Sequence, residues 1–154
     1  MAIVRHVHRG SSSRPAELVP GELVWANIIN GLENPLATGK ARPVILVEQH
    51  GSAWKTLGLT TNPHHRDGSP RVAIPAPLKV GLKKPGWLWG GRLCWTSGID
   101  VGDHIGWVDL PLAFEVIKLA QLDGSVGKHL LASAREHHGS PASPDLRLVD
   151  GDLL

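Results

Sequence analysis

The first two thirds of the chain alternate between apolar and polar positions with a period of two, which is typical of half-buried strands. In residues 21–29 the apolar side chains alternate between two faces. Residues 43–48 contain an unbroken apolar run and predict a second strand. Residues 53–60 predict a third strand after a turn at residues 50–52. The second and third strands are therefore expected to pair as an antiparallel hairpin.

Two shorter strand signals follow, both limited by glycine or proline. Residues 71–77 predict a short strand whose prolines exclude it from the centre of a sheet. Residues 87–95 resume the alternating pattern, with a bend or bulge expected at Gly90 and Gly91. Several short strands at close spacing predict a mainly β fold, either a small antiparallel barrel or a sandwich.

The apolar period changes to that of a helix in the last third of the chain. Asp109 has the residue type of an N-cap, Pro111 fits the first turn, and apolar residues recur at helical spacing as far as residue 122. An Asp-Gly pair then interrupts the pattern. Residues 126–138 predict a second, weaker helix.

Length and composition predict one ordered domain with flexible ends. The chain has 154 residues, about the size of one ordinary domain. Residues 1–19 are polar and predict a flexible arm, and residues 139–154 predict a disordered tail. The domain is expected to span residues 20–138. It includes a loop at residues 30–41, and loops of this length are often functional.

Charge, cysteine and histidine content narrow the function only slightly. The formal net charge is +2, so electrostatics alone does not indicate a nucleic-acid-binding protein. The single cysteine, Cys94, excludes an intrachain disulfide and is typical of a reducing compartment. His6 and His8 have no further ligand at usable spacing, so no metal is expected. No apolar stretch approaches the roughly 20 residues of a membrane span, which predicts a cytoplasmic protein.

Arg42 and Thr60 are the strongest candidates for chemistry. Arg42 precedes a proline at the start of the second strand, and Thr60 and Thr61 end the third. Because the strands of a hairpin run in opposite directions, the start of one lies beside the end of the other. A guanidinium gives phosphate forked, charge-assisted hydrogen bonds, and a hydroxyl adds a compact donor. The alternative is a solvated arginine beside ordinary strand threonines.

Four segments resemble the MazF/PemK family of type II toxins in their order and spacing. They are PGELVWANI (20–28), GKARPVILVE (39–48), LGLTTNP (57–63) and GWVDLPLAFEVIKLAQL (106–122). The resemblance covers residues 20–122. It implies a small SH3-like antiparallel β-barrel of the MazF/PemK/CcdB type, with a C-terminal α-helix.

The resemblance also implies an activity and partners. Members of this family are homodimeric toxins of type II toxin-antitoxin systems that inhibit growth. They are metal-independent endoribonucleases without a cofactor, and they cleave single-stranded RNA at short sequences. The nucleophile is the 2′-hydroxyl of the RNA itself, which explains discrimination against DNA. A cognate antitoxin neutralises the toxin by laying a disordered tail across the RNA groove.

Three residues match catalytic positions of the family. Arg42 matches its catalytic arginine, which stabilises the phosphorane and is a candidate acid. Thr60 matches the first threonine of its Thr-Thr pair and is expected to anchor the phosphate. Arg92 matches an arginine of the PemK branch, expected to act as a second cation or acid. The further residues expected to bind RNA are Lys40, Thr61, His64 and His65.

Cys94 is the main departure from the family pattern. It stands where the PemK branch has an aspartate, so Asp100 or Asp103 would have to reach the site if a carboxylate base is needed. Cys94 itself is expected to be a small buried residue. The base is otherwise open. His64 and His65 titrate in a suitable range, and the alternative is that they are exposed loop histidines.

The tryptophans fall into two groups. Trp25 and Trp107 are expected in the core. Trp87 and Trp89 alternate with an apolar residue, so they share one face of a strand. That face would line either an RNA groove or a dimer interface.

Two other functions are compatible with the sequence. One is a catalytically impaired protein of the same fold that binds RNA or an antitoxin without cutting, which Cys94 favours. The other is a poison of DNA gyrase like CcdB, which shares the barrel. CcdB-like chains lack the Arg-Pro and Thr-Thr pairing, so Arg42 and Thr60 argue against this second alternative.

Overall fold

The computed structural model describes residues 17–26, 41–61, 63, 71–89, 93–97 and 101–139. Its strands are β1 (Glu22–Ala26), β2 (Arg42–His50), β3 (Ala53–Thr60), β4 (Arg71–Ala73), β5 (Trp87–Trp89), β6 (Cys94–Ser97) and β7 (Val101–Trp107). Its helices are the short 3-10 helix η2 (Pro77–Val80), α1 (Leu110–Ala120) and α2 (Gly124–His137). Most of the predicted arm, loop and tail lies outside the described residues.

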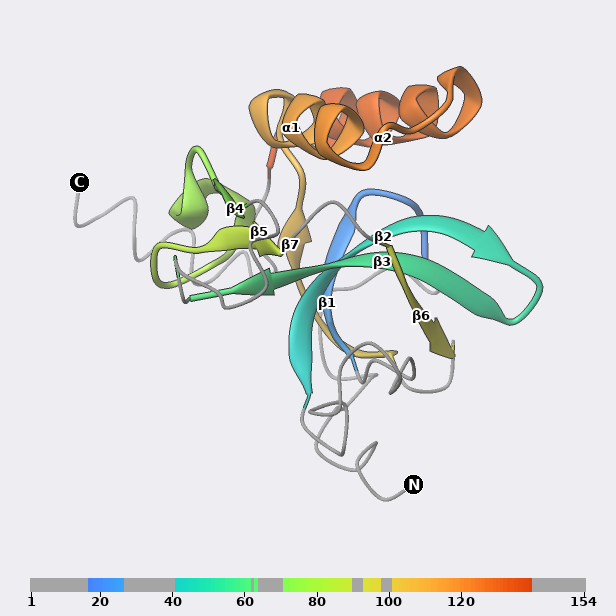
Figure 1. The fold of residues 1–154 in the computed structure, drawn as a ribbon, viewed down its shortest axis with the longest axis horizontal. Coiled ribbons are helices and arrows are strands. Elements are labelled where there is room, and N and C mark those ends of the chain that lie inside the picture. Colours follow the sequence, from blue (N-terminus) through green and yellow to red (C-terminus); the bar gives the residue numbers. More distant parts are fainter. Residues whose placement is uncertain are drawn as a thin grey trace.

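The described strands form one antiparallel sheet in the order β4-β5-β3-β2-β1-β7, and β6 pairs with β3 beside this path (Figure 1). The prediction of a mainly β, antiparallel fold with C-terminal helices is confirmed. Closure into a barrel is not seen, because no pairing among the described strands joins β4 to β7. Instead the sheet forks at β3, which pairs with β6 along its first half and with β5 at its end.

The β2–β3 hairpin is the centre of the sheet. Its register pairs Val44 with Gly58 and Leu46 with Thr56, and the register then shifts at a bulge. Gly51 closes the turn with a φ of 64°, which a residue without a side chain adopts at little cost. The predicted third strand has the predicted bounds, and β2 extends beyond the prediction at both ends.

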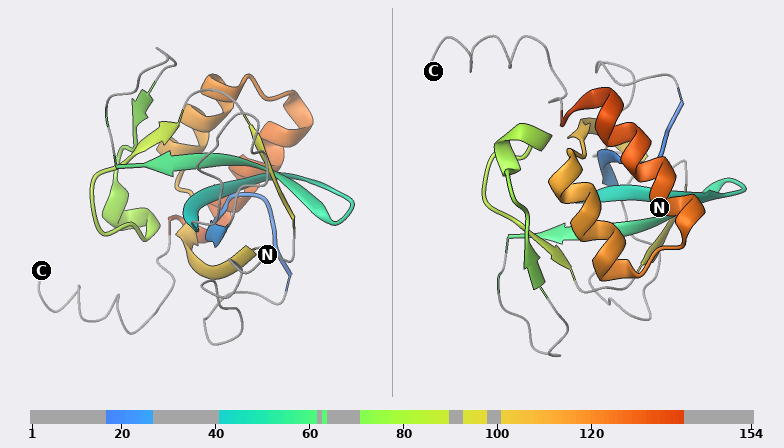
Figure 2. Two further views of the ribbon diagram at one scale, coloured as in Figure 1. Left: turned by 60° about the horizontal axis from the view of Figure 1, so that its bottom comes forward. Right: turned by 90° about the horizontal axis from the view of Figure 1, so that it is seen from above.

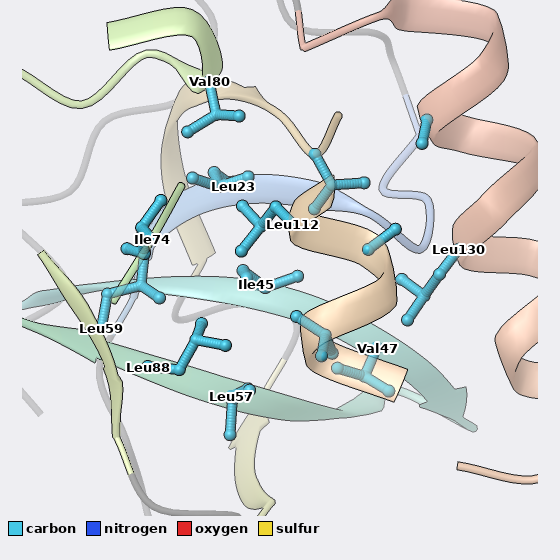
Figure 3. Packing of buried hydrophobic residues seen from close by; sticks show 14 of the residues in the cluster. Leu23, Ile45, Val47, Leu57, Leu59, Ile74, Val80, Leu88, Leu112 and Leu130 are labelled. Carbon is cyan, nitrogen blue, oxygen red and sulfur yellow. The ribbon is translucent and has the colours of Figure 1, made fainter. Parts of the chain in front are cut away.

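Both helices cover one face of this sheet and lie side by side above it (Figure 2). Leu112 of α1 and Leu130 of α2 are fully buried against the apolar residues of that face (Figure 3). Each such side chain contributes about 1.5–3 kcal/mol through burial. The strand residues that face the helices are Leu23, Ile45, Val47, Leu57, Leu59 and Leu88.

The opposite face of the sheet carries the alternate residues of the same strands. A second apolar cluster lies there, with Leu18 and Cys94 packed against it. Its buried members are Val24, Ala26, Val44, Leu46, Trp54 and Val101. No described helix covers this face (Figure 1). Arg42 and Thr60, at its margin, are partly exposed.

The starts of both helices follow from their caps. Asp109 accepts a hydrogen bond from the backbone N–H of Leu112 at 3.0 Å, as an N-cap does, which confirms the predicted start of α1. Asp123 caps α2 in the same way through Val126 N–H at 2.9 Å. The predicted second helix is therefore confirmed, and the Asp-Gly pair that ends the first pattern also begins the second helix.

Some sequence predictions for strands and core residues are wrong. Trp25 is 42% exposed, because its partner in the register is Pro43, beyond the helix-covered cluster. Trp107 is 5% exposed, as predicted. Cys94 is half-buried rather than buried. Strand β7 has no counterpart among the predicted strands, because two glycines and two polar residues weaken its alternation.

Candidate functional site

Arg42 and Thr60 lie on the same face of neighbouring strands. Arg42 is the first residue of β2, and Thr60 is the last residue of β3. The ladder that pairs Val44 with Gly58, continued by two residues, places Thr60 across from Arg42. Side chains two residues apart on a strand share a face, so both point away from the helices. The predicted juxtaposition is present in the structure.

Trp89 brings β5 into the same site. The ζ-carbon of Arg42 lies 5.3 Å from the centroid of the Trp89 ring. This distance is within the range of a cation–π contact. Gly58 lies between them on β3 and has no side chain, so the guanidinium and the indole approach each other across that strand. Trp87, two residues before Trp89, pairs with Thr60 and faces the same side.

Arg71 contacts the same ring from β4. Its ζ-carbon also lies 5.3 Å from the Trp89 centroid, and the two residues are direct partners in the β4–β5 ladder. In the strand order β5 stands between β4 on one side and β3 and β2 on the other. The strands that carry the two arginines therefore lie on opposite sides of β5. We call Arg42, Thr60, Arg71 and Trp89 the arginine–tryptophan site.

Arg42 brings a positive charge to this site. Among the described residues, Arg42 forms no ion pair with a carboxylate. Its Nε is buried and has no hydrogen-bond partner among the same residues. A buried donor without a partner costs free energy, which a bound anion would recover. A guanidinium carries a positive charge at neutral pH. The arrangement can therefore bind an anion such as a phosphodiester, with an indole beside it for stacking.

Only some of the other predicted site residues lie near Arg42 and Thr60. Thr61 follows β3 directly and is exposed. Asp103 lies on β7, which β1 separates from β2, and no ion pair joins Asp103 to Arg42 in the described part of the chain. Its Oδ1 is buried without a hydrogen-bond partner there. The candidates that lie outside the described residues are Lys40, His64, His65, Arg92 and Asp100.

The contacts of Cys94 are those of a residue that packs within the sheet. Its carbonyl accepts a hydrogen bond from Oγ1 of Thr56 at 3.3 Å, and the same hydroxyl lies 3.3 Å from Oγ1 of Thr96. Its side chain packs against the second apolar cluster. These contacts support the interpretation of Cys94 as a packing residue.

Sequence reasoning missed Arg71. The signal was available, since Arg71 occupies the first position of a short strand, as Arg42 does. Arg42 precedes a proline, and Arg71 precedes Val72, which packs against the helix-covered cluster. What the sequence did not reveal is that β4 and β2 lie on opposite sides of β5.

A second group of polar side chains is buried between β1, β7 and α2. Glu22 is fully buried, and its Oε2 lies 2.9 Å from Nδ1 of His104. The His104 ring lies 5.3 Å from the Trp107 ring. The ring of His137 stacks on Trp107 at 3.6 Å with an interplanar angle of 9°. Burial lowers the pKa of His137 below its ordinary value of 6.5, and the nearby Glu136 opposes this shift.

Comparisons with known proteins identify no family. No protein-family model matches the sequence, and no curated protein matches it either. Within the described residues, no helix has the length and apolarity needed to cross a membrane. The same residues hold no group of three histidine, cysteine or acidic side chains that could bind a metal, and His6 and His8 lie outside them.

Proposed function

We propose that this protein is a metal-independent endoribonuclease that cleaves single-stranded RNA, acting as the toxin of a type II toxin-antitoxin system. The single observation that supports the proposal most is the placement of Arg42 and Thr60 on one face of adjacent strand ends, beside Trp89. A cation, a hydroxyl and an aromatic face are the groups that bind the phosphate and base of a nucleotide.

The proposed reaction uses the 2′-hydroxyl of the RNA. The 2′-oxygen attacks the adjacent phosphorus, the bond from phosphorus to the 5′-oxygen breaks, and the products are a 2′,3′-cyclic phosphate and a 5′-hydroxyl. Arg42 stabilises the extra negative charge on the phosphorane, and Thr60 holds a phosphate oxygen. A base takes the 2′ proton and an acid protonates the 5′-oxygen. The base is one of His64, His65 or a carboxylate, and the candidate acids are Arg42 and Arg92.

The proposal extends to fold and partners. An SH3-like barrel of the MazF/PemK/CcdB type is supported by the order of elements, with short antiparallel strands followed by terminal helices. A homodimer, a cognate antitoxin and a cytoplasmic location belong to the same proposal, because they accompany this activity in the family that the sequence resembles.

The test of this function is cleavage of a mixed-sequence RNA in the presence of EDTA. We expect cleavage to persist in EDTA and to fall by about 10²- to 10³-fold in Arg42→Ala, the usual loss when one transition-state donor is removed. Arg42→Lys keeps the charge but not the fork, so it should recover only part of the rate. Lys118→Ala is the matched control, since it removes an exposed cation from α1, on the opposite side of the sheet. Cleavage unchanged in Arg42→Ala would reject the assignment.

A catalytically impaired RNA-binding protein is the second candidate. Two observations favour it: Cys94 has a packing role, and β1 separates the strand of Asp103 from that of Arg42. Among the described residues, the site therefore has no carboxylate that could act as a base. In that case the RNA stays intact while the wild-type protein still binds it and Arg42→Ala does not.

A further inference from the structure

Arg42 needs support if its guanidinium is to meet a phosphate in a fixed place. An arginine side chain is long and flexible, and a displacement of about 1 Å at a reacting group costs roughly 10²-fold in rate. Among the described residues, no carboxylate pairs with Arg42, and its buried Nε has no hydrogen-bond partner. The contact that the structure shows for this guanidinium is the indole of Trp89, whose centroid lies 5.3 Å from the ζ-carbon.

The sheet brings this indole to Arg42. The β3–β5 ladder, continued by one residue, places Trp89 across from Gly58. Gly58 has no side chain, so the ring has room to reach over β3 toward Arg42 on the next strand. Trp89 is half-buried, and on the other side of β5 it pairs with Arg71, whose ζ-carbon lies 5.3 Å from the ring centroid. The ring is therefore packed within the sheet before any ligand binds.

An aromatic ring supports a guanidinium differently from a carboxylate. A carboxylate accepts the forked pair of N–H groups and neutralises the charge, so it competes with a phosphate for both. A ring attracts the cation through its quadrupole and carries no net charge. The indole of Trp89 therefore holds the guanidinium of Arg42 while its charge and its forked donors stay available to a phosphate.

We propose that Trp89 is a positioning residue that acts through Arg42, holding the guanidinium where it meets the reacting phosphate. This inference rests on the proposed function and gives Trp89 a role besides stacking. Stacking on a base acts equally on the bound ground state and the transition state, so it changes KM. Positioning of Arg42 acts on the charge that grows during the reaction, so it changes kcat.

Nuclear magnetic resonance of the arginine side chains tests this support without any RNA. In protein with isotope-labelled arginine, the heteronuclear NOE of each Nε reports its motion on the ps–ns timescale. We expect a high, backbone-like value for Arg42 and a low value for Arg135, an exposed arginine of α2. Trp89→Leu should lower the Arg42 value toward that of Arg135. Trp89→Phe keeps an aromatic face and should retain most of it.

Trp95→Leu is the matched control for this measurement. Trp95 also has a cation beside its ring, because Nζ of Lys55 lies 5.5 Å from the ring centroid. It pairs with Lys55, well before Thr60 on β3, so its loss should leave the Arg42 value unchanged. A low value for Arg42 in the wild type overturns the proposal, even if Trp89→Leu does not fold. A value that stays high in folded Trp89→Leu also overturns it.

Cleavage of a mixed-sequence RNA measures the effect on the reaction. Trp89→Leu should lower kcat by about 10-fold, within the range expected for a misplaced catalytic group. Trp89→Phe should recover most of this loss, and Trp95→Leu should leave kcat unchanged. When Arg42→Ala is already present, adding Trp89→Leu should leave kcat within about 2-fold, because no guanidinium is left to position.

Two kinetic results would contradict the inference. One is the same loss of kcat from Trp89→Leu with and without Arg42, which would mean that Trp89 does not act through Arg42. The other is a raised KM with kcat unchanged, which would leave stacking as its only role. If the wild type does not cleave RNA, the proposed function fails, and the NOE values still decide whether Trp89 holds Arg42.

Discussion

Trp89 and Trp107 are each in contact with two nitrogen-rich side chains, but the two surroundings differ. Trp89 is half-buried, and both of its neighbours are arginines. Trp107 is 5% exposed, and its neighbours are His104 and His137. Arginine keeps its charge when it is partly buried, whereas burial lowers the pKa of His137 below its ordinary value.

This difference shows how similar ring contacts serve different purposes. The stacked ring of His137 packs on Trp107 as a flat neutral group, and its lowered pKa is consistent with that role. At Trp89, Arg42 is partly accessible and forms no ion pair among the described residues, so its charge is available to a ligand. We therefore expect substitutions around Trp107 to change stability, and substitutions around Trp89 to change binding.

The largest effect is expected for Trp107→Ala. Removing a buried indole costs about 3–5 kcal/mol through lost burial and the cavity left behind. Trp89→Ala should cost clearly less, because its ring is half-buried at the margin of the sheet. Urea unfolding followed by circular dichroism measures both. Equal losses for the two variants would remove the distinction between the two rings.

Glu22→Ala is expected to have the next largest effect. It leaves Nδ1 of His104 buried without its carboxylate partner, and hydrogen bonds to charged groups are worth about 1.5–3 kcal/mol. Glu22→Gln retains an acceptor at this position and should lose less. The free energy of unfolding of both variants at neutral pH gives the measurement. A loss in Glu22→Gln as large as in Glu22→Ala would show that the charge matters more than the hydrogen bond.

A smaller effect on stability, combined with a loss of binding, is expected for Trp89→Leu. Leucine retains apolar contact with the sheet but has no π face, so base stacking and the cation–π contacts are lost. Stacking of one base on an aromatic side chain is worth about 1–3 kcal/mol. The affinity for a mixed-sequence RNA with 2′-O-methyl groups, which cannot be cleaved, should therefore fall by about 5-fold or more, while the unfolding midpoint changes little. Unchanged affinity would place Trp89 outside the proposed RNA site.

The same contrast shows what the sequence alone could predict. The neighbourhood of Arg42 and Thr60 follows from local rules, because a tight turn at Gly51 and a period of two determine which ends meet and which side they face. Both helices were also predictable, since their caps and apolar spacing are local. The position of Arg71 depends on β5 pairing with the end of β3, a long-range pairing that no local pattern encodes.

The group formed by Glu22, His104, Trp107 and His137 could be predicted only in part, for a related reason. Burial of Trp107 was expected, but Glu22 reads as an ordinary polar residue at the start of a strand. Its burial requires His104, which is 82 residues further along the chain. Strand β7, which carries His104, was itself missed because glycine and polar residues interrupt its pattern. An interaction between two buried polar groups is visible only once the strands that carry them are known to pair.

The smallest effect is expected from the titration of His137. Because its pKa is lower in the folded protein than in the unfolded chain, the unfolded chain binds more protons as the pH falls. His137 therefore favours folding at pH values above 6.5, and this contribution is lost as the pH falls through 6.5 toward the folded pKa. The charged or titratable groups around it are Glu136, which opposes the shift, together with His104, Glu22 and His138.

His137→Gln removes this titration and keeps a planar polar group against Trp107. The free energy of unfolding, measured by urea titration between pH 5 and pH 8, should then fall less steeply toward acid in the variant than in the wild type. The matched control is His129→Gln, which replaces an exposed histidine of the same helix and should leave the slope unchanged. A wild-type stability that falls less steeply toward acid than that of His137→Gln would mean that His137 gains a proton on folding. The stacked imidazole would then be a cation like the arginines on Trp89, and the contrast between the two rings would be lost.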